Sequence, residues 1–211
     1  MLVREPALCR VVAEEGRMEN GSGTYVKRLR DLEGLYEDAA AFAEAVRREG
    51  DRIVYDVTEY RPSSNAGDMI FGVTRMSPGK IGREYFLTRG HIHARTDRPE
   101  VYYGEAGSGV MLLESPEGEI RVLPMAPRVV CYVPPYWIHR SVNTGVSDLV
   151  MTFFYPADSG QDYDVIARSG GMRQRIVADE TGHWVAVDNT DYRPRDQAVV
   201  GAMLAPAGSG S

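Results

Sequence analysis

Residues 87–110 read LTRGHIHARTDRPEVYYGEAGSGV, and they hold two of the four histidines in the chain. Side chains two positions apart on an extended strand point to the same face, so His91 and His93 are predicted to project together. The segment 94–99 carries turn-forming residues, and the run after it is rich in valine and tyrosine, which favour β-strands. This stretch therefore predicts β structure that brings functional side chains onto one face.

The same strand-forming composition extends to both sides of this stretch. Short runs rich in valine, isoleucine, tyrosine and threonine alternate with turn signals, including SPG at 77–79 and a hairpin tip at 115–118. Nine strands are predicted, at 52–60, 69–76, 83–88, 100–105, 109–114, 119–125, 128–133, 139–144 and 148–155. Their close spacing, without a helical period between them, predicts one all-β domain, a sandwich or barrel.

Helices are predicted only around this β region. Residues 38–49 place apolar positions on one face, with Asp38 as N-cap and a glycine stop after the last turn. A short helix is predicted at 162–167, followed by two further strands at 173–179 and 183–188.

Three regions are expected along the chain. They are an N-terminal extension over 1–50 whose helix packs on the barrel, a barrel domain over 51–190, and a C-terminal extension over 191–211. The last residues, APAGSGS, are small and polar, so the end of this extension is expected to be mobile.

The composition argues against several classes of function. The 211 residues carry a formal net charge of -6, which gives no broad attraction for nucleic acid or an anionic membrane. No stretch approaches the roughly 20 apolar residues of a membrane span, and charges at Arg4, Glu5 and Arg10 interrupt any apolar signal core. Cys9 and Cys131 are therefore expected to be reduced thiols in a cytoplasmic protein, with Cys131 buried in an apolar run.

Three histidines and one glutamate form a candidate metal site. Glu100 begins the strand-like run after the turn, where it could return to the face of His91 and His93, and His139 follows a Pro-Pro turn at the start of another strand. Three neutral imidazoles and a carboxylate suit a divalent first-row metal and leave coordination positions open. The fourth histidine, His183, is interpreted as an ordinary structural residue.

These residues resemble the two motifs of the cupin superfamily. The motifs, HxH with a following glutamate and glycine, and PxGxxHxxxN, correspond here to His91, His93, Glu100, Gly107, Pro134, His139 and Asn143. The gap before Glu100 is longer than usual, and Tyr136 replaces the glycine of the second motif. With these departures, TRGHIHARTDRPEVY and PPYWIHRSVN resemble the signatures of the cupin-type glucose-6-phosphate isomerases, and the likeness covers most of residues 25–189.

This resemblance implies a cupin β-barrel (a jelly-roll sandwich) and a metal-dependent homodimer that interconverts glucose-6-phosphate and fructose-6-phosphate. It implies one divalent metal per subunit, Fe²⁺ first, with Mn²⁺, Ni²⁺ and Zn²⁺ as alternatives. Glu100 and Tyr155 are implied as catalytic residues. Whether Glu100 serves as ligand, as base or as both stays open, as does the choice between an enediol and a direct hydride shift.

The resemblance also implies the residues that bind the substrate. The phosphate would be held by Thr74, Thr88, the Gly90 amide and Tyr163, and the sugar by Tyr55, Tyr102 and Tyr155. Related enzymes carry GHDY where this chain has GQDY at 160–163, so Gln161 offers an amide donor that cannot be cationic. Because each charge-assisted hydrogen bond is strong, a few hydroxyls and amides suffice for a phosphate without a basic patch.

Two other functions stay open as hypotheses. One is a metal cupin enzyme of other specificity, such as a mannose-6-phosphate isomerase or an oxygenase; the other is a non-catalytic sugar-phosphate-binding cupin. The phosphate elements at Thr88 and Gly90 argue against an oxygenase, and a complete ligand set that includes Glu100 argues against a pure binder.

Overall fold

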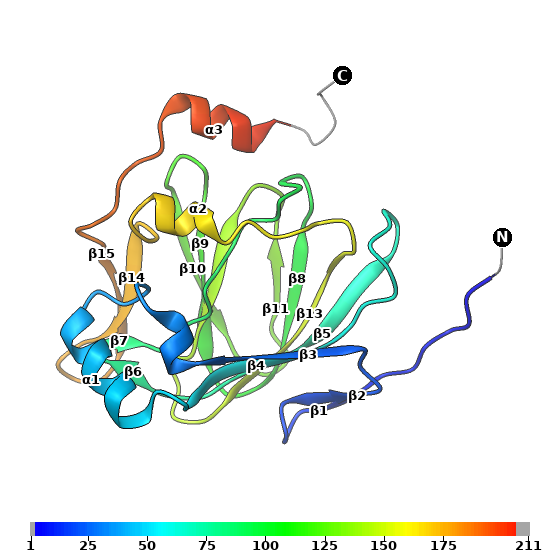
Figure 1. The fold of residues 1–211 in the computed structure, drawn as a ribbon, viewed down its shortest axis with the longest axis horizontal. Helices are drawn as coiled ribbons and strands as arrows, with labels where there is room; N and C mark the ends of the chain where they lie inside the picture. The colour runs from blue at the N-terminus through cyan, green and yellow to red at the C-terminus, as the bar shows by residue number, and fades with distance from the viewer. Residues whose placement is uncertain (1–2, 206–211) are drawn as a thin grey trace.

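The computed structural model describes residues 3–205, and antiparallel β-sheets dominate this part of the chain (Figure 1). The largest sheet has the strand order β11-β8-β13-β5-β4-β3. Its strands are β3 (Gly23–Arg28), β4 (Ile53–Tyr60), β5 (Met69–Met76), β8 (Glu100–Ala106), β11 (Val130–Val133) and β13 (Leu149–Pro156). Every neighbouring pair in it is antiparallel.

A second sheet has the order β10-β9-β12, and its strands are β9 (Gly109–Glu114), β10 (Ile120–Met125) and β12 (Ile138–Val142). β9 and β10 form the predicted hairpin around 115–118. β9 is buried at every position, which agrees with its apolar run GVMLLE. Fully buried residues of both sheets, such as Leu112, Ile138 and Met151, belong to one hydrophobic core. The two sheets therefore stabilise one another through the burial of apolar surface.

Short sheets flank this core. One has the order β15-β14-β7-β6, with β6 (Lys80–Ile81), β7 (Glu84–Tyr85), β14 (Gln174–Ala178) and β15 (Trp184–Asp188). The other is the pair β1 (Arg10–Val12) and β2 (Arg17–Glu19).

The helices lie around the sheets (Figure 1). They are the 3₁₀ helix η1 (Leu29–Leu32) and the α-helices α1 (Ala39–Glu49), α2 (Asp164–Arg168) and α3 (Gln197–Leu204). The Asp38 side chain accepts a 2.8 Å hydrogen bond from the Ala41 amide and so caps α1 as predicted, and α1 buries Phe42 and Ala45. Among the described residues, no helix is long and apolar enough to span a membrane.

The structure confirms the predicted all-β class with short peripheral helices, and it corrects several details. Strand pairing within 83–88 is limited to β7, and residues 87–93 form only isolated bridges, Leu87 with Val142, His91 with His139 and Ile92 with Asp162. Gly90 has a φ of +71°, which breaks the regular strand predicted around the two histidines. The predicted mobile end falls largely on residues 206–211, outside the described residues.

Besides short elements such as β1, β2 and η1, two longer ones lie in segments where no regular structure was expected. β3 pairs with β4 along the edge of the largest sheet, so residues before position 50 contribute to it. Helix α3, capped by the Asp196 side chain through a 2.8 Å hydrogen bond from the Val199 amide, forms within the segment 191–211.

Candidate active site

Three imidazoles converge on one carboxylate oxygen. Oε2 of Glu100, at the start of β8, lies 2.9 Å from Nε2 of His139, 3.2 Å from Nε2 of His93 and 3.7 Å from Nε2 of His91. His93, His139 and Glu100 are buried, and the His91 side chain is 12% exposed. The antiparallel bridge between His91 and His139 holds two of the rings beside each other. The structure therefore brings all four predicted metal ligands into one cluster.

The hydrogen bonds on the far side of two rings favour a cation in this cluster. Nδ1 of His93 lies 2.8 Å from the Arg98 carbonyl, and Nδ1 of His139 lies 3.1 Å from the Trp137 carbonyl, so each Nδ1–H donates outward. A neutral imidazole then presents a lone pair at Nε2, where it faces the Glu100 oxygen, another acceptor. A cation between the Nε2 atoms and the carboxylate would relieve this conflict, and outward Nδ1–H bonds are the usual support of metal-bound histidines.

Two further observations fit a metal. Nε2 of His91 and Nε2 of His93 are buried without a hydrogen-bond partner among the described residues. Burial lowers the pKa of His91 to about 4, so this ring is neutral at pH 7. Burial opposes ionisation of Glu100, but its contacts with the rings of His139, His91 and His93 together hold the pKa of this carboxyl well below its usual value. Neutral imidazoles and an ionised carboxylate are the forms that bind a divalent metal.

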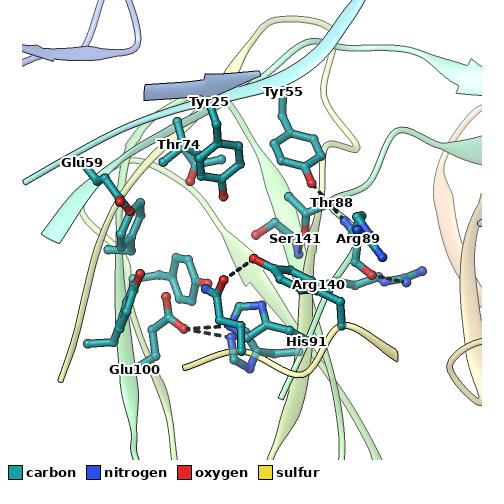
Figure 2. Close-up of a pocket in the computed structure, with 18 of the residues that line it drawn as sticks. Tyr25, Tyr55, Glu59, Thr74, Thr88, Arg89, His91, Glu100, Arg140 and Ser141 are labelled. Carbon is teal, nitrogen blue, oxygen red and sulfur yellow. Dashed lines mark hydrogen bonds and ion pairs between the residues drawn. The ribbon is translucent and has the colours of Figure 1, made fainter. Parts of the chain in front are cut away.

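A cavity of about 190 Å³ opens beside the cluster. At ~30 Å³ per water, it has room for roughly six waters, which suits a small polar molecule. The predicted site residues that line it are Tyr55, Thr74, Thr88, Gly90, His91, Glu100, Tyr102, His139, Tyr155, Gln161 and Tyr163. His93 lines a different hollow and meets the cluster through its ring, 3.2 Å from Glu100. Figure 2 shows His91 and Glu100 at one end of the cavity and Tyr55 and Thr74 at the other.

Thr88 and Ser141 join the far end of the cavity to β12. The Thr88 amide donates to the Ser141 carbonyl at 3.0 Å, and the Ser141 amide donates to Oγ1 of Thr88 at 3.1 Å. The Arg89 amide points toward the Tyr55 hydroxyl at 3.5 Å. His139 lies two residues before Ser141 on β12. Because Thr88 is bonded to Ser141, the strand fixes the distance between the Thr88 hydroxyl and the imidazole cluster.

The cavity is more cationic than the sequence motifs predict. Arg61, Arg89 and Arg140 line it, and the Arg89 guanidinium lies 4.9 Å above the Tyr163 ring. Burial lowers the pKa of Arg140 to about 10, which leaves its guanidinium charged at pH 7. The expectation that a phosphate would be bound without a basic patch is therefore incomplete, because the fold lines the cavity with arginines from three separate segments.

Several lining residues were absent from the sequence prediction. Those with a polar group are Tyr25, Glu59, Arg61, Arg89, Arg140 and Ser141. Arg89 and Arg140 each adjoin a predicted site residue in the sequence, and this position was the one feature from which a place at the site could have been predicted. Tyr25 and Arg61 carry no motif, and only the pairing of β3 with β4 brings Tyr25 to the cavity. Arg61 donates to Oε1 of Glu59 at 3.1 Å and to the Tyr155 hydroxyl at 3.3 Å.

The tyrosine hydroxyls of the cavity are protonated donors at neutral pH. Burial raises the pKa of Tyr55 to about 12 and also raises the pKa values of Tyr102, Tyr155 and Tyr163. The Tyr163 hydroxyl donates to Oε1 of Gln161, so the NH₂ group of this amide is left to donate elsewhere. These groups can bind hydroxyl and phosphate oxygens of a small substrate.

Comparisons with known proteins agree with this chemistry. The family described as glucose-6-phosphate isomerase (GPI) matches residues 26–195. A glucose-6-phosphate isomerase of Sinorhizobium medicae is 60% identical over 94% of this chain and 93% of its own length. That of Pyrococcus horikoshii is 44% identical over 91% of this chain and all of its own. An oxalate oxidase structure aligns with 51% of this chain and 54% of its own length, at 16% identity and a TM-score of 0.43.

The family match therefore spans the candidate metal ligands, the cavity residues other than Tyr25 and most of the β-sheets, and the identities are well above those at which a family assignment is secure. The chain belongs to the glucose-6-phosphate isomerase family.

Proposed function

We propose that this protein interconverts glucose-6-phosphate and fructose-6-phosphate, using one divalent metal held by His91, His93, Glu100 and His139. The observation that carries the proposal is the convergence of three imidazole Nε2 atoms on one carboxylate oxygen, at the wall of a cavity whose other end carries hydroxyl, amide and guanidinium donors. Such a cavity can bind the anionic end of a sugar phosphate and present its reacting carbons to the cluster.

The phosphate is placed at the end of the cavity away from Glu100. Thr88, the Gly90 amide and Thr74 supply uncharged donors there, and Arg89 adds a guanidinium. A charged donor and several neutral ones together give the charge-assisted hydrogen bonds that phosphate recognition requires. Tyr163 supports Arg89 through its ring.

The sugar hydroxyls and the reacting carbons are assigned to the other end. A bound divalent metal supplies Lewis acidity to the carbonyl oxygen of the substrate. Tyr102 and Tyr155 lie near the cluster, with their rings 6.0 Å from His139 and 5.5 Å from His93 respectively, between centroids. Their protonated hydroxyls can donate to sugar oxygens, and Arg61 holds the Tyr155 hydroxyl in place at 3.3 Å.

Glu100 combines two properties that bear on its role. It is fully buried and surrounded by imidazoles, so it is ionised, and the same contacts make it a weak base. We infer that binding the metal is its main role. Movement of a proton at the reacting carbons would need a carboxylate freed from at least one of these contacts.

We propose Fe²⁺ as the resident ion, because an imidazole and carboxylate donor set accepts it readily. The same donor set also accepts Mn²⁺, Ni²⁺ and Zn²⁺. Metal analysis of the protein purified from its own source identifies the ion.

We propose that the protein is a cytoplasmic homodimer. An apolar row crosses the outer face of the largest sheet, in which Tyr132 pairs with Val101, Val101 with Phe154 and Phe154 with Phe71. Tyr132 is 55% exposed and Phe154 38% exposed, which is unusual for large apolar side chains in one row across a sheet and supports contact with a second copy. The two free thiols, Cys9 and Cys131, support the cytoplasm.

A coupled assay tests the proposed activity. The purified protein is supplied with fructose-6-phosphate, and glucose-6-phosphate formation is followed before and after chelation and after return of the metal. Turnover that is lost on chelation and restored by metal supports the proposal. Binding of fructose-6-phosphate without turnover in fully metal-loaded protein would indicate a sugar-phosphate binder, and faster turnover of mannose-6-phosphate would indicate a different specificity.

A further inference from the structure

The segment that joins the cluster to the phosphate end contains a β-bulge. Leu87 bridges to Val142, and His91 bridges to His139, so residues 87–91 span one residue more than the segment 139–142 opposite them. The extra residue lies near Gly90, whose φ of +71° is the left-handed conformation of a glycine bulge. A Cβ at this position would also lie 2.7 Å from Cδ1 of Ile166 and 2.9 Å from Cβ of Arg140.

The bulge turns one peptide group out of the strand pairing. The carbonyl of Arg89 accepts a 2.7 Å hydrogen bond from Nη2 of Arg140, and the N–H of the same peptide belongs to Gly90. In a trans peptide the N–H and C=O point in opposite directions, so the bond to Arg140 directs the Gly90 N–H away from that side chain. Gly90 lines the cavity, and within residues 3–205 no group accepts a hydrogen bond from its amide.

Arg140 is a buried charged residue, and its hydrogen bond to the Arg89 carbonyl is therefore important for it. The residue is 5% exposed, and its Nε has no hydrogen-bond partner among the described residues. The carboxylate of Glu84 lies in its surroundings but is already bonded to Arg175, at 3.1 and 3.2 Å. The bond to the Arg89 carbonyl is thus a principal polar contact of a buried charge. A cation on the carbonyl side polarises the peptide and makes its N–H a stronger donor.

We propose that Arg140 is a positioning residue for the substrate phosphate, which it serves through the Arg89–Gly90 peptide. It holds the Gly90 N–H toward the cavity and places positive charge behind it. The inference depends on the proposed function in one respect: it assumes that the anion bound at the Gly90 amide is the phosphate group of the sugar phosphate. Arg89, by contrast, presents its guanidinium in the cavity beside Tyr163.

The sequence offers a direct probe of this peptide. Arg-Gly occurs once in the chain, at positions 89 and 90. Labelling arginine carbonyls with ¹³C and glycine amides with ¹⁵N therefore isolates the Gly90 amide in a carbonyl-edited NMR spectrum of the zinc-loaded protein. Titration with inorganic phosphate then reports the dissociation constant and the response of this one N–H, without requiring turnover.

Two variants of Arg140 carry the test. In Arg140→Met the phosphate dissociation constant is expected to rise about tenfold, with an upfield Gly90 amide proton whose shift responds weakly to phosphate. Arg140→Lys keeps a cation able to reach the Arg89 carbonyl and is expected to recover most of the loss. In the coupled assay the same factor should appear in KM for fructose-6-phosphate, with kcat changed less than about threefold.

Arg175→Met is the matched control, since it also removes a buried guanidinium but one that does not contact residues 88–90. It is expected to lower Tm while leaving phosphate binding unchanged. The proposal is overturned if Arg140→Met folds and binds phosphate like the parent, with an unchanged response of the Gly90 amide. If Arg140→Met does not fold, an unaltered phosphate dissociation constant in Arg140→Gln overturns the proposal. Phosphate binding in a parent protein without isomerase activity would count against the proposed function alone.

Discussion

The guanidinium of Arg98 and the carboxylate of Asp158 form a bidentate ion pair, with Nε to Oδ1 at 2.9 Å and Nη2 to Oδ2 at 2.8 Å. The backbone carbonyl of the same arginine accepts the hydrogen bond from Nδ1 of His93 at 2.8 Å. Nη1 of Arg95 forms a further ion pair with Oδ2 of Asp158, also at 2.8 Å. One carboxylate on the loop after β13 therefore anchors the loop that orients a proposed metal ligand.

Asp158→Asn is expected to weaken metal binding about tenfold without removing any proposed ligand, because outer contacts orient the ligands and tune their affinity. Competition with a chelator of known affinity measures the change. Asp179→Asn is the control, because the pKa of Asp179 is also lowered, by its hydrogen bond with Thr181, at a site away from the cluster. Equal metal affinities in the two variants would contradict the anchoring role.

The same ion pair predicts an acid dependence. The hydrogen bond from Arg98, reinforced by both arginine charges, lowers the pKa of Asp158 below its usual value of 3.8. A carboxyl with a depressed folded-state pKa stabilises the fold above its unfolded pKa, and this contribution is lost as pH falls from about 4 toward the folded value. Metal-free Asp158→Asn should lose less stability than the parent between about pH 4 and 3, as measured by urea unfolding. A parallel decline in both proteins would be inconsistent with this pair.

Removal of a proposed ligand should remove the metal. His93→Ala is expected to lower the metal content to below about a tenth of the parent value, because the loss of one of four proposed ligands weakens the binding of the ion. Elemental analysis measures the content, and His183→Ala is the control, since His183 is exposed and bonded to Thr181. Full metal content in folded His93→Ala would remove this residue from the ligand set.

Thr88→Ala should raise KM for fructose-6-phosphate about tenfold while kcat changes less than about threefold, because Thr88 binds the phosphate away from the reacting carbons. Steady-state kinetics separates the two constants. Thr88→Ser keeps the hydroxyl that accepts from the Ser141 amide and should behave like the parent. A fall in kcat alone would place Thr88 in the chemical step instead.

The two thiols should differ in reactivity. Burial raises the pKa of Cys131 to about 11, and the residue is 4% exposed, so very little thiolate is available at pH 8. Cys9 is partly exposed. A thiol reagent should modify one cysteine in the native protein and the second only on unfolding, and Cys9→Ser should abolish the fast reaction. Rapid modification of Cys131 in native Cys9→Ser would contradict its burial.

Much of the fold follows from local patterns. The runs at 53–60, 69–76 and 149–156 are long and rich in β-forming residues, and each forms a strand close to its predicted limits. The segment 83–93 was harder to predict, because a single glycine at position 90 and isolated bridges interrupt an otherwise β-like sequence. β3 has few apolar residues and is half exposed, so its pairing with β4 depends on an available sheet edge and not on its own pattern.

The local sequence is enough to predict the metal ligands, since the spacing of His91, His93, Glu100 and His139 is visible along the chain. Which charged residues surround these ligands depends on the tertiary structure. Arg61, Arg89 and Arg140 come from three segments, and they line one cavity because sheet pairing and a β-bulge bring those segments around it. The interaction between charged side chains depends on their separation in space. That separation is fixed by strand register and loop geometry, which no local pattern encodes.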